Sequence, residues 1–195
     1  MNNVKEGIST RNIVFCAVLT AIVVILQFFG ASIHLGPFSV SLVLIPIVIG
    51  TATCGTWAGA WLGLIFGIVV LASGDAGAFL AVNVPGTIIT VLLKGIACGF
   101  LAGIVYNFVK KYNRYAAVVA AAVVCPVVNT GIFLIGCRLF FWETVVGWAT
   151  ELGFANAAQY MIFGLAGGNF LFEFALNIIL SPIIIRLLSI RKKAQ

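Results

Sequence analysis

The chain has 195 residues, of which 63% are hydrophobic and 8% are charged; its mean hydropathy is +1.20 and its formal net charge is +6. Soluble domains carry about 45–50% apolar and about 25% charged residues, so this composition excludes a cytosolic enzyme and is typical of a membrane protein. Because a membrane-spanning helix takes about 20 residues, we expect residues 1–195 to form a single integral membrane domain with short connections.

Six apolar stretches in chain order predict an all-α polytopic membrane protein with six transmembrane helices, at 12–30, 38–52, 56–72, 87–109, 116–138 and 159–188. The first stretch lacks a following cleavage site and is interpreted as an uncleaved span. The second is unusually short. Pro46 and Pro126 are expected to interrupt the second and fifth spans. Residues 73–86 mix glycines with apolar side chains, a composition that suits a lid closing over a pocket. Residues 139–158 are expected to form another outer loop.

The basic residues are distributed unevenly along the chain. Nine of the eleven lie near the termini or in one short connection: Lys5, Arg11, Lys110, Lys111, Arg114, Arg186, Arg191, Lys192 and Lys193. Such segments stay on the cytoplasmic side of a bilayer, and an even number of spans puts both termini on that side. The positive charge therefore indicates topology, with both termini cytoplasmic, and we expect no binding of nucleic acid.

Glycines recur every four residues in two of the predicted spans: Gly55, Gly59, Gly63 and Gly67 in the third, and Gly95, Gly99 and Gly103 in the fourth. This spacing places them on one helix face, where a neighbouring backbone can approach closely. Packing between helices of this chain is the simpler explanation. The alternative is a surface that slides on, or docks to, a second membrane protein.

Four polar side chains fall at a common depth, in the outer half of the predicted bilayer: Lys94, Asn129, Asn169 and Glu173. An ionisable side chain in a span costs about 2.5–3.5 kcal/mol, so a shared depth across three helices predicts a polar cavity open to the outside. Arg138 is expected at the mouth of this cavity, and Asn83 belongs to the predicted lid.

Simpler explanations remain open for these side chains. Lys94 and Glu173 could pair only to hold two helices together. Asn129 could bond to the backbone near Pro126, and Arg138 could extend to the membrane interface.

No site for covalent chemistry is present in the sequence. The five cysteines form no C-x-x-C pair, the chain has one histidine, and no nucleophile or phosphate-loop motif occurs. We predict no catalytic residue, no metal site and no cofactor, and hence a protein that is not an enzyme. ATP-driven work would have to come from a partner.

Three segments together resemble one family. They are Ala17-Val18-Leu19-Thr20-Ala21, the run from Gly36-Pro37-Phe38 to Gly63, and Pro126-Val127-Val128-Asn129-Thr130-Gly131. With six spans in about 190 residues, the chain resembles the substrate-binding S component of energy-coupling factor (ECF) transporters, the bacterial vitamin importers, and within them the riboflavin-type branch that includes pantothenate binders.

The resemblance implies roles for several residues. Lys94, Asn129, Asn169, Glu173, Arg138 and Asn83 would contact the vitamin, while Ala17 and Ala21 would contact a membrane T component. It also implies two cytoplasmic ATPase subunits and a multi-pass location in the bacterial plasma membrane. The cations Lys94 and Arg138 favour an anionic ligand such as pantothenate, whereas the aromatic content leaves the flat ring of riboflavin open.

Two other functions remain as alternatives. An autonomous small-solute permease could act as an oligomer through its glycine faces. An intramembrane enzyme is disfavoured because no paired catalytic residues are present.

Overall fold

The computed structural model describes residues 10–30, 34–35, 38–39 and 42–193. This part of the chain is almost entirely helical, which confirms the predicted all-α class. The exception is a pair of antiparallel strands of two residues each, β1 (His34–Leu35) and β2 (Phe38–Ser39). The helical elements are α1 (Thr10–Gly30), α2 (Leu44–Cys54), α3 (Thr56–Ala72), α4 (Gly77–Leu80), α5 (Val84–Val109), α6 (Arg114–Phe140), α7 (Trp142–Glu151), α8 (Ala157–Gln159), the π-helix η1 (Tyr160–Gly167) and α9 (Gly168–Lys193).

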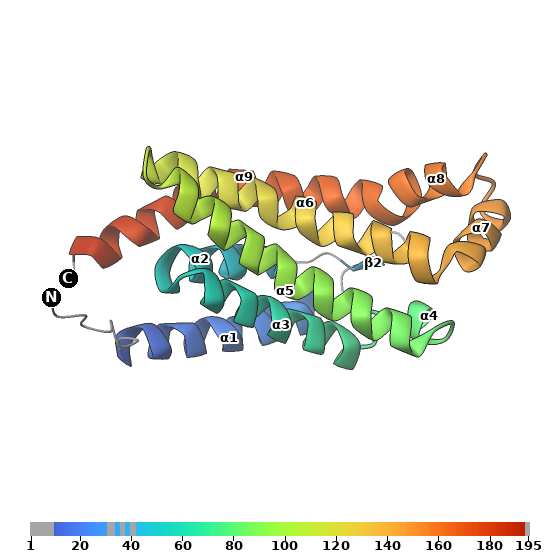
Figure 1. Cartoon of the computed structure of the whole chain (residues 1–195), viewed down its shortest axis with the longest axis horizontal. Helices are drawn as coiled ribbons and strands as arrows, with labels where there is room; N and C mark the ends of the chain where they lie inside the picture. Colours follow the sequence, from blue (N-terminus) through green and yellow to red (C-terminus); the bar gives the residue numbers. More distant parts are fainter. Residues whose placement is uncertain (1–9, 31–33, 36–37, 40–41, 194–195) are drawn as a thin grey trace, which may run out of the picture.

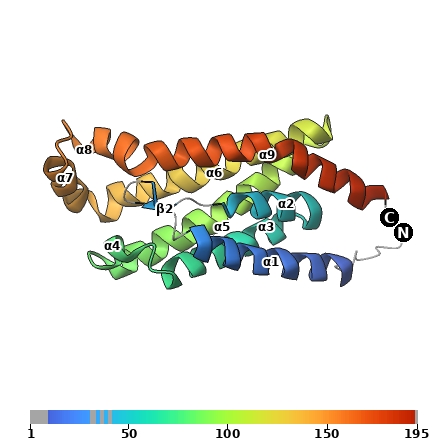
Figure 2. The same ribbon diagram turned by 180° about the vertical axis from the view of Figure 1, so that it is seen from behind.

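The long helices lie side by side in an elongated bundle (Figure 1, with the reverse side in Figure 2). One end, here called the basic end, holds the start of α1, the α5–α6 turn with Lys110 and Arg114, and the end of α9. The opposite end, here called the distal end, holds α4, α7 and α8. By length and apolar composition, α1, α5, α6 and the stretch Ala157–Arg186 can each cross a membrane, whereas α2 and α3 are shorter apolar helices.

The short helix α2 is central to the bundle. It packs against α1, α3, α5, α6 and α9, and its side chains Leu44, Ile47 and Val48 are completely buried. Eleven residues of helix extend about 16 Å, roughly half of the hydrocarbon thickness. α2 lies toward the basic end and does not extend into the distal half (Figure 1). The interior of the distal half is therefore lined by side chains from α3, α5, α6 and α9.

The two glycine rows face each other in the α3–α5 interface. A Cβ atom on Gly63 would overlap the carbonyl oxygen of Gly95, and one on Gly99 would overlap that of Gly59. Thr51 of α2 adds a hydrogen bond, from its hydroxyl to the Gly99 carbonyl oxygen at 3.4 Å. Internal helix packing is therefore confirmed, and the alternative of a glycine surface for a second protein is wrong because the rows are used inside this chain.

Several predicted boundaries were wrong. The second span was expected from residue 38, but α2 begins at Leu44, so Pro46 falls in its first turn, where a missing N–H is tolerated. Pro46 therefore does not interrupt the helix. Pro126 lies inside α6, which runs unbroken from Arg114 to Phe140. The outer connections are not plain loops, because the first contains α4 and the second contains α7 and α8.

Candidate functional site

Lys94 lies in the distal half of the bundle between two aromatic rings. Its ammonium nitrogen is 5.6 Å from the ring centroid of Phe66 on α3 and 5.4 Å from that of Phe133 on α6. A desolvated cation–π contact contributes up to about 2 kcal/mol. Two such contacts offset most of the roughly 2.5–3.5 kcal/mol that a lysine at this depth costs. The rings therefore allow a positive charge to stay inside the bundle.

An aromatic cluster covers Lys94 on the distal side. Phe79, on the short helix α4, makes edge-to-face contacts with Phe133, Phe141 and Trp148, with ring centroids 5.5, 5.0 and 5.5 Å apart. Phe79 is buried, so the segment expected to be a lid inserts a side chain into the bundle. Since Phe133 touches both Phe79 and Lys94, movement of α4 would alter the surroundings of the cation.

Asn129 provides the second buried polar group. Its side chain is only 5% exposed, and its amide oxygen has no hydrogen-bond partner among the described residues. Leaving a buried acceptor unsatisfied costs about 1–3 kcal/mol, which a ligand or water donating to it would recover. The alternative of a hydrogen bond to a backbone carbonyl near Pro126 concerns the amide nitrogen of Asn129, and it stays open.

A polar stripe of three side chains on α9 faces the interior. Glu173, Asn177 and Ser181 are all buried; the Asn177 amide donates to the Glu173 carbonyl oxygen at 2.8 Å, and the Ser181 hydroxyl donates to the Asn177 carbonyl oxygen at 2.7 Å. α9 packs against α6, the helix that carries Asn129. The buried polar side chains of α9 therefore lie on a helix adjacent to α6.

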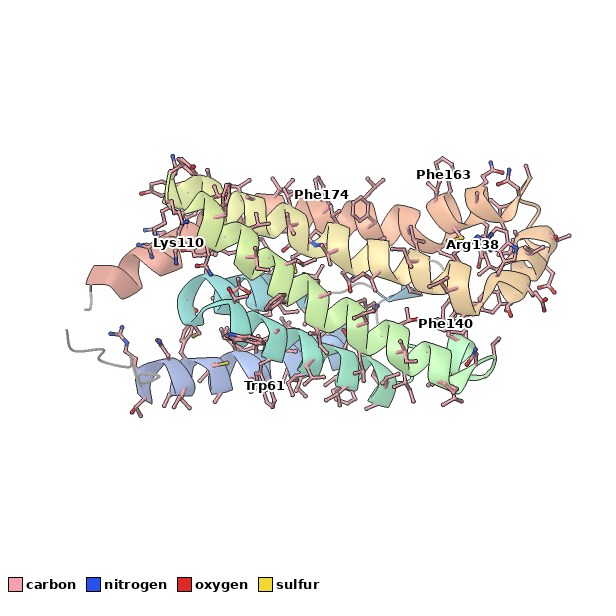
Figure 3. The ribbon with its side chains drawn as sticks, viewed as in Figure 1. Trp61, Lys110, Arg138, Phe140, Phe163 and Phe174 are labelled. Carbon is pink, nitrogen blue, oxygen red and sulfur yellow. The ribbon has the colours of Figure 1, made fainter. Side chains whose placement is uncertain are left out.

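Three other predicted residues have different outcomes. The backbone of Asn169 lies in the first turn of α9, but its side chain is outside the described residues. Asn83 caps α5, its side-chain oxygen accepting the Gly86 N–H at 2.9 Å. Arg138 is exposed at the distal end (Figure 3), where its guanidinium stacks on the Trp142 ring at 4.0 Å. A ligand role for these three stays a prediction.

A hydrogen bond connects α1 to the turn before α4. Gln27 is 1% exposed, and its amide nitrogen donates to the Asp75 carboxylate at 3.2 Å. Its amide oxygen has no hydrogen-bond partner in the described part of the chain. The segment that carries Phe79 is thus tied to α1.

The opposite half of α1 presents a small-residue face. Ala17 and Ala21 are both exposed, and beside Ala17 a groove of about 600 Å³ opens between α1 and the start of α3. Trp57 and Trp61 form its other wall. The indole N–H of Trp61, which is labelled in Figure 3, donates to the Thr20 hydroxyl at 3.3 Å. This face can therefore receive the apolar side chains of another membrane helix.

Comparisons with known proteins agree with this architecture. The sequence model of the ECF transporter substrate-specific component matches residues 11–185. The chain belongs to this family. Its fold is similar to that of ThiT from Listeria monocytogenes, with a TM-score of 0.68 and 21% sequence identity over 90% of this chain and 94% of that one. No curated protein sequence shows significant similarity.

Membership in the S-component family carries several consequences. It implies a T component and ATPase subunits as partners, a vitamin as substrate, and a membrane location, and it is consistent with a transport subunit rather than an enzyme. Neither comparison supports the riboflavin or pantothenate preference expected from the sequence: the family model names no vitamin, and the structural likeness is to ThiT. At 21% identity this likeness shows the fold alone.

Sequence reasoning missed the aromatic neighbours and Gln27. Phe66, Phe79 and Phe133 are three of 16 phenylalanines, and nothing in their spacing distinguishes them. Gln27 had a usable signal, because an amide inside an apolar span requires a partner.

Proposed function

We propose that this S component captures a small vitamin in the distal half of its bundle, enclosed by α3, α5, α6 and α9 and covered by α4. The proposal keeps six passes of the chain through the membrane, with α2 and α3 as the two short ones, the basic end in the cytoplasm and the distal end outside. The observation that carries the site is the buried, unsatisfied amide oxygen of Asn129 on α6, a helix that packs against the one carrying Glu173. Lys94 and its two rings form the other wall.

The surroundings of this site favour a ring-containing vitamin that is not an anion. Lys94 is already compensated by two rings, and Arg138 is exposed and stacked on Trp142. The argument for a carboxylate or phosphate on the ligand, which rested on these two cations, is therefore weakened. A buried carboxylate at Glu173 and an aromatic cluster around Phe79 suit a flat, nitrogen-rich ring. Together with the likeness to ThiT, this favours a thiamine-type vitamin.

Delivery would use the face of α1 that carries Ala17 and Ala21. We propose that a T-component helix packs there and extends into the groove lined by Trp57 and Trp61. Small residues allow close approach of helices in a membrane, where packing drives association.

A titration of the purified chain in detergent tests the proposed substrate class. Thiamine, riboflavin and pantothenate are each added, and binding is followed by quenching of tryptophan fluorescence, since Trp148 belongs to the aromatic cluster. Saturable binding of thiamine with much weaker binding of the other two supports the proposal. Tight binding of pantothenate alone would contradict the argument from charge.

The autonomous permease loses its structural basis, because its proposed oligomer surface is occupied by the α3–α5 contact. Liposomes containing the chain without ATPases separate the two functions. Vitamin accumulation inside them would favour the permease, whereas uptake only with the T component and ATP supports the S component.

A further inference from the structure

The helix that carries Glu173 begins in an unusual conformation. The π-helix η1 spans the eight residues Tyr160–Gly167 and joins α8 to α9 without a break, since Gln159 (φ −62°, ψ −44°) and Gly168 (φ −65°, ψ −47°) are both helical. π-helices are rare, appear mostly as single turns, and are frequent at functional sites. An eight-residue π segment directly before the polar stripe of α9 therefore requires an explanation.

A π turn changes which residues face the interior further along the helix. Its hydrogen bonds run from residue i to i+5, one residue more than in an α-helix, where each residue advances by about 100°. If one π turn became α, Phe172 would take the position of Glu173, and the carboxylate would rotate toward the lipid. In the structure Glu173 is buried whereas Phe172 is 42% exposed, so the π register puts the carboxylate inside.

Tyr160 packs on Gly164 inside η1. Tyr160 is buried, and its ring lies against Phe154 with centroids 5.2 Å apart. A Cβ atom on Gly164 would overlap the Tyr160 ring and approach Phe154 to 3.5 Å. The opposite side of η1 is exposed, with Phe163 pointing away from the bundle (Figure 3). Gly168, four residues later, has open space where its Cβ would lie.

We propose that η1 sets the register of α9, and that Tyr160 and Gly164 are positioning residues that direct Glu173 into the substrate site. This assignment rests on the proposed function for the identity of the site. The register itself can be measured without any ligand.

Cross-linking between α9 and Cys125 reads the register, because α6 packs against α9 and Cys125 and Glu173 are both buried in the bundle. In a chain whose other four cysteines are replaced by serine, single cysteines are placed at Phe172, Glu173 or Phe174 and oxidised with copper phenanthroline. With native η1, the strongest disulfide forms with Glu173→Cys. With Gly164→Ala, the maximum moves to Phe172→Cys, whereas Gly168→Ala leaves it at Glu173→Cys. A maximum that stays at position 173 in Gly164→Ala overturns the proposal.

Deletion of Gly167 tests the same point without adding a side chain. If η1 holds one extra residue, the deletion turns a π turn into an α turn and the maximum stays at Glu173→Cys. If η1 does not set the register, the maximum moves to Phe174→Cys, which overturns the proposal.

Vitamin affinity supplies a second, separate readout. Gly164→Ala should weaken binding about tenfold or more, as expected when a buried charged partner is lost. Adding the Gly167 deletion to Gly164→Ala should restore affinity, because the deletion returns Glu173 to the site. General damage to folding would not be repaired by removing a residue. A shifted cross-link with unchanged affinity would support the role of η1 in setting the register. It would contradict the assignment of Glu173 to the vitamin site.

Discussion

Gln27 on α1 donates a hydrogen bond of 3.2 Å to the carboxylate of Asp75, in the turn that precedes α4. The two residues are 48 positions apart, and Gln27 is buried. Four residues after Asp75, Phe79 enters the aromatic cluster above Lys94. The cover of the proposed vitamin site is thus held at two points, by a charged hydrogen bond and by edge-to-face ring contacts.

Asp75→Ala should accelerate vitamin release. Hydrogen bonds to charged groups contribute about 1.5–3 kcal/mol, so loss of this one should raise the dissociation rate roughly tenfold. Stopped-flow fluorescence after dilution of the loaded protein measures that rate. Asp75→Asn, which keeps an acceptor oxygen, should have a smaller effect. Equal rates for the native chain and Asp75→Ala would show that this bond does not hold the cover.

Asn129→Ala should weaken vitamin binding about tenfold or more, because the ligand then loses a buried acceptor. Assembly with the T component should remain intact. Asn107→Ala is the matched control, since Asn107 lies near the basic end and donates to Thr56 at 2.8 Å. Calorimetric titration of both variants measures the effect. Similar losses of affinity in the two would indicate general destabilisation rather than a ligand contact.

Gly63→Ala should lower the thermal midpoint in detergent, because its Cβ would overlap the Gly95 carbonyl oxygen. Overpacking of this kind typically costs about 1–3 kcal/mol. Gly131→Ala should leave the midpoint unchanged or raise it, since nothing lies within 4 Å of a Cβ there and alanine is the better helix former by about 1 kcal/mol. A midpoint in Gly63→Ala at or above that of Gly131→Ala would contradict the observed α3–α5 contact.

Ala17→Leu should abolish uptake while leaving vitamin affinity unchanged, because it adds bulk to the proposed docking face without touching the distal half. Ala116→Leu makes the same change at an exposed position of α6 and should be neutral. Co-purification with a tagged T component separates binding from assembly. Normal assembly of the Ala17→Leu protein with the T component would contradict the assignment of this face as the docking surface.

The sequence was informative where a pattern repeats within one helix. Glycines every four residues predicted close helix contact, and the structure supplies the partners as Gly63 with Gly95 and Gly59 with Gly99. The prediction of a common depth for Lys94, Asn129 and Glu173 relied on the cost of polar groups in a membrane. Asn129 and Glu173 are buried in the structure, and Lys94 is partly buried. Local periodicity and burial cost were sufficient for these features.

Features that depend on contacts between distant segments could not be predicted. Gln27 meets Asp75, and Phe79 meets Phe133, only after the bundle has formed. The contact of Tyr160 with Gly164 lies inside the π-helix, whose residues have the composition of an ordinary apolar helix. The start of α2, by contrast, had a local signal, because Pro46 lies in its first turn and proline is favoured there.

Mass spectrometry of small molecules released from the purified, detergent-extracted protein tests the central claim most directly. We predict one vitamin at close to one equivalent, with thiamine favoured, and its loss from Asn129→Ala protein that is otherwise folded. Protein that carries no vitamin and binds none on incubation with thiamine, riboflavin or pantothenate would contradict the proposed site.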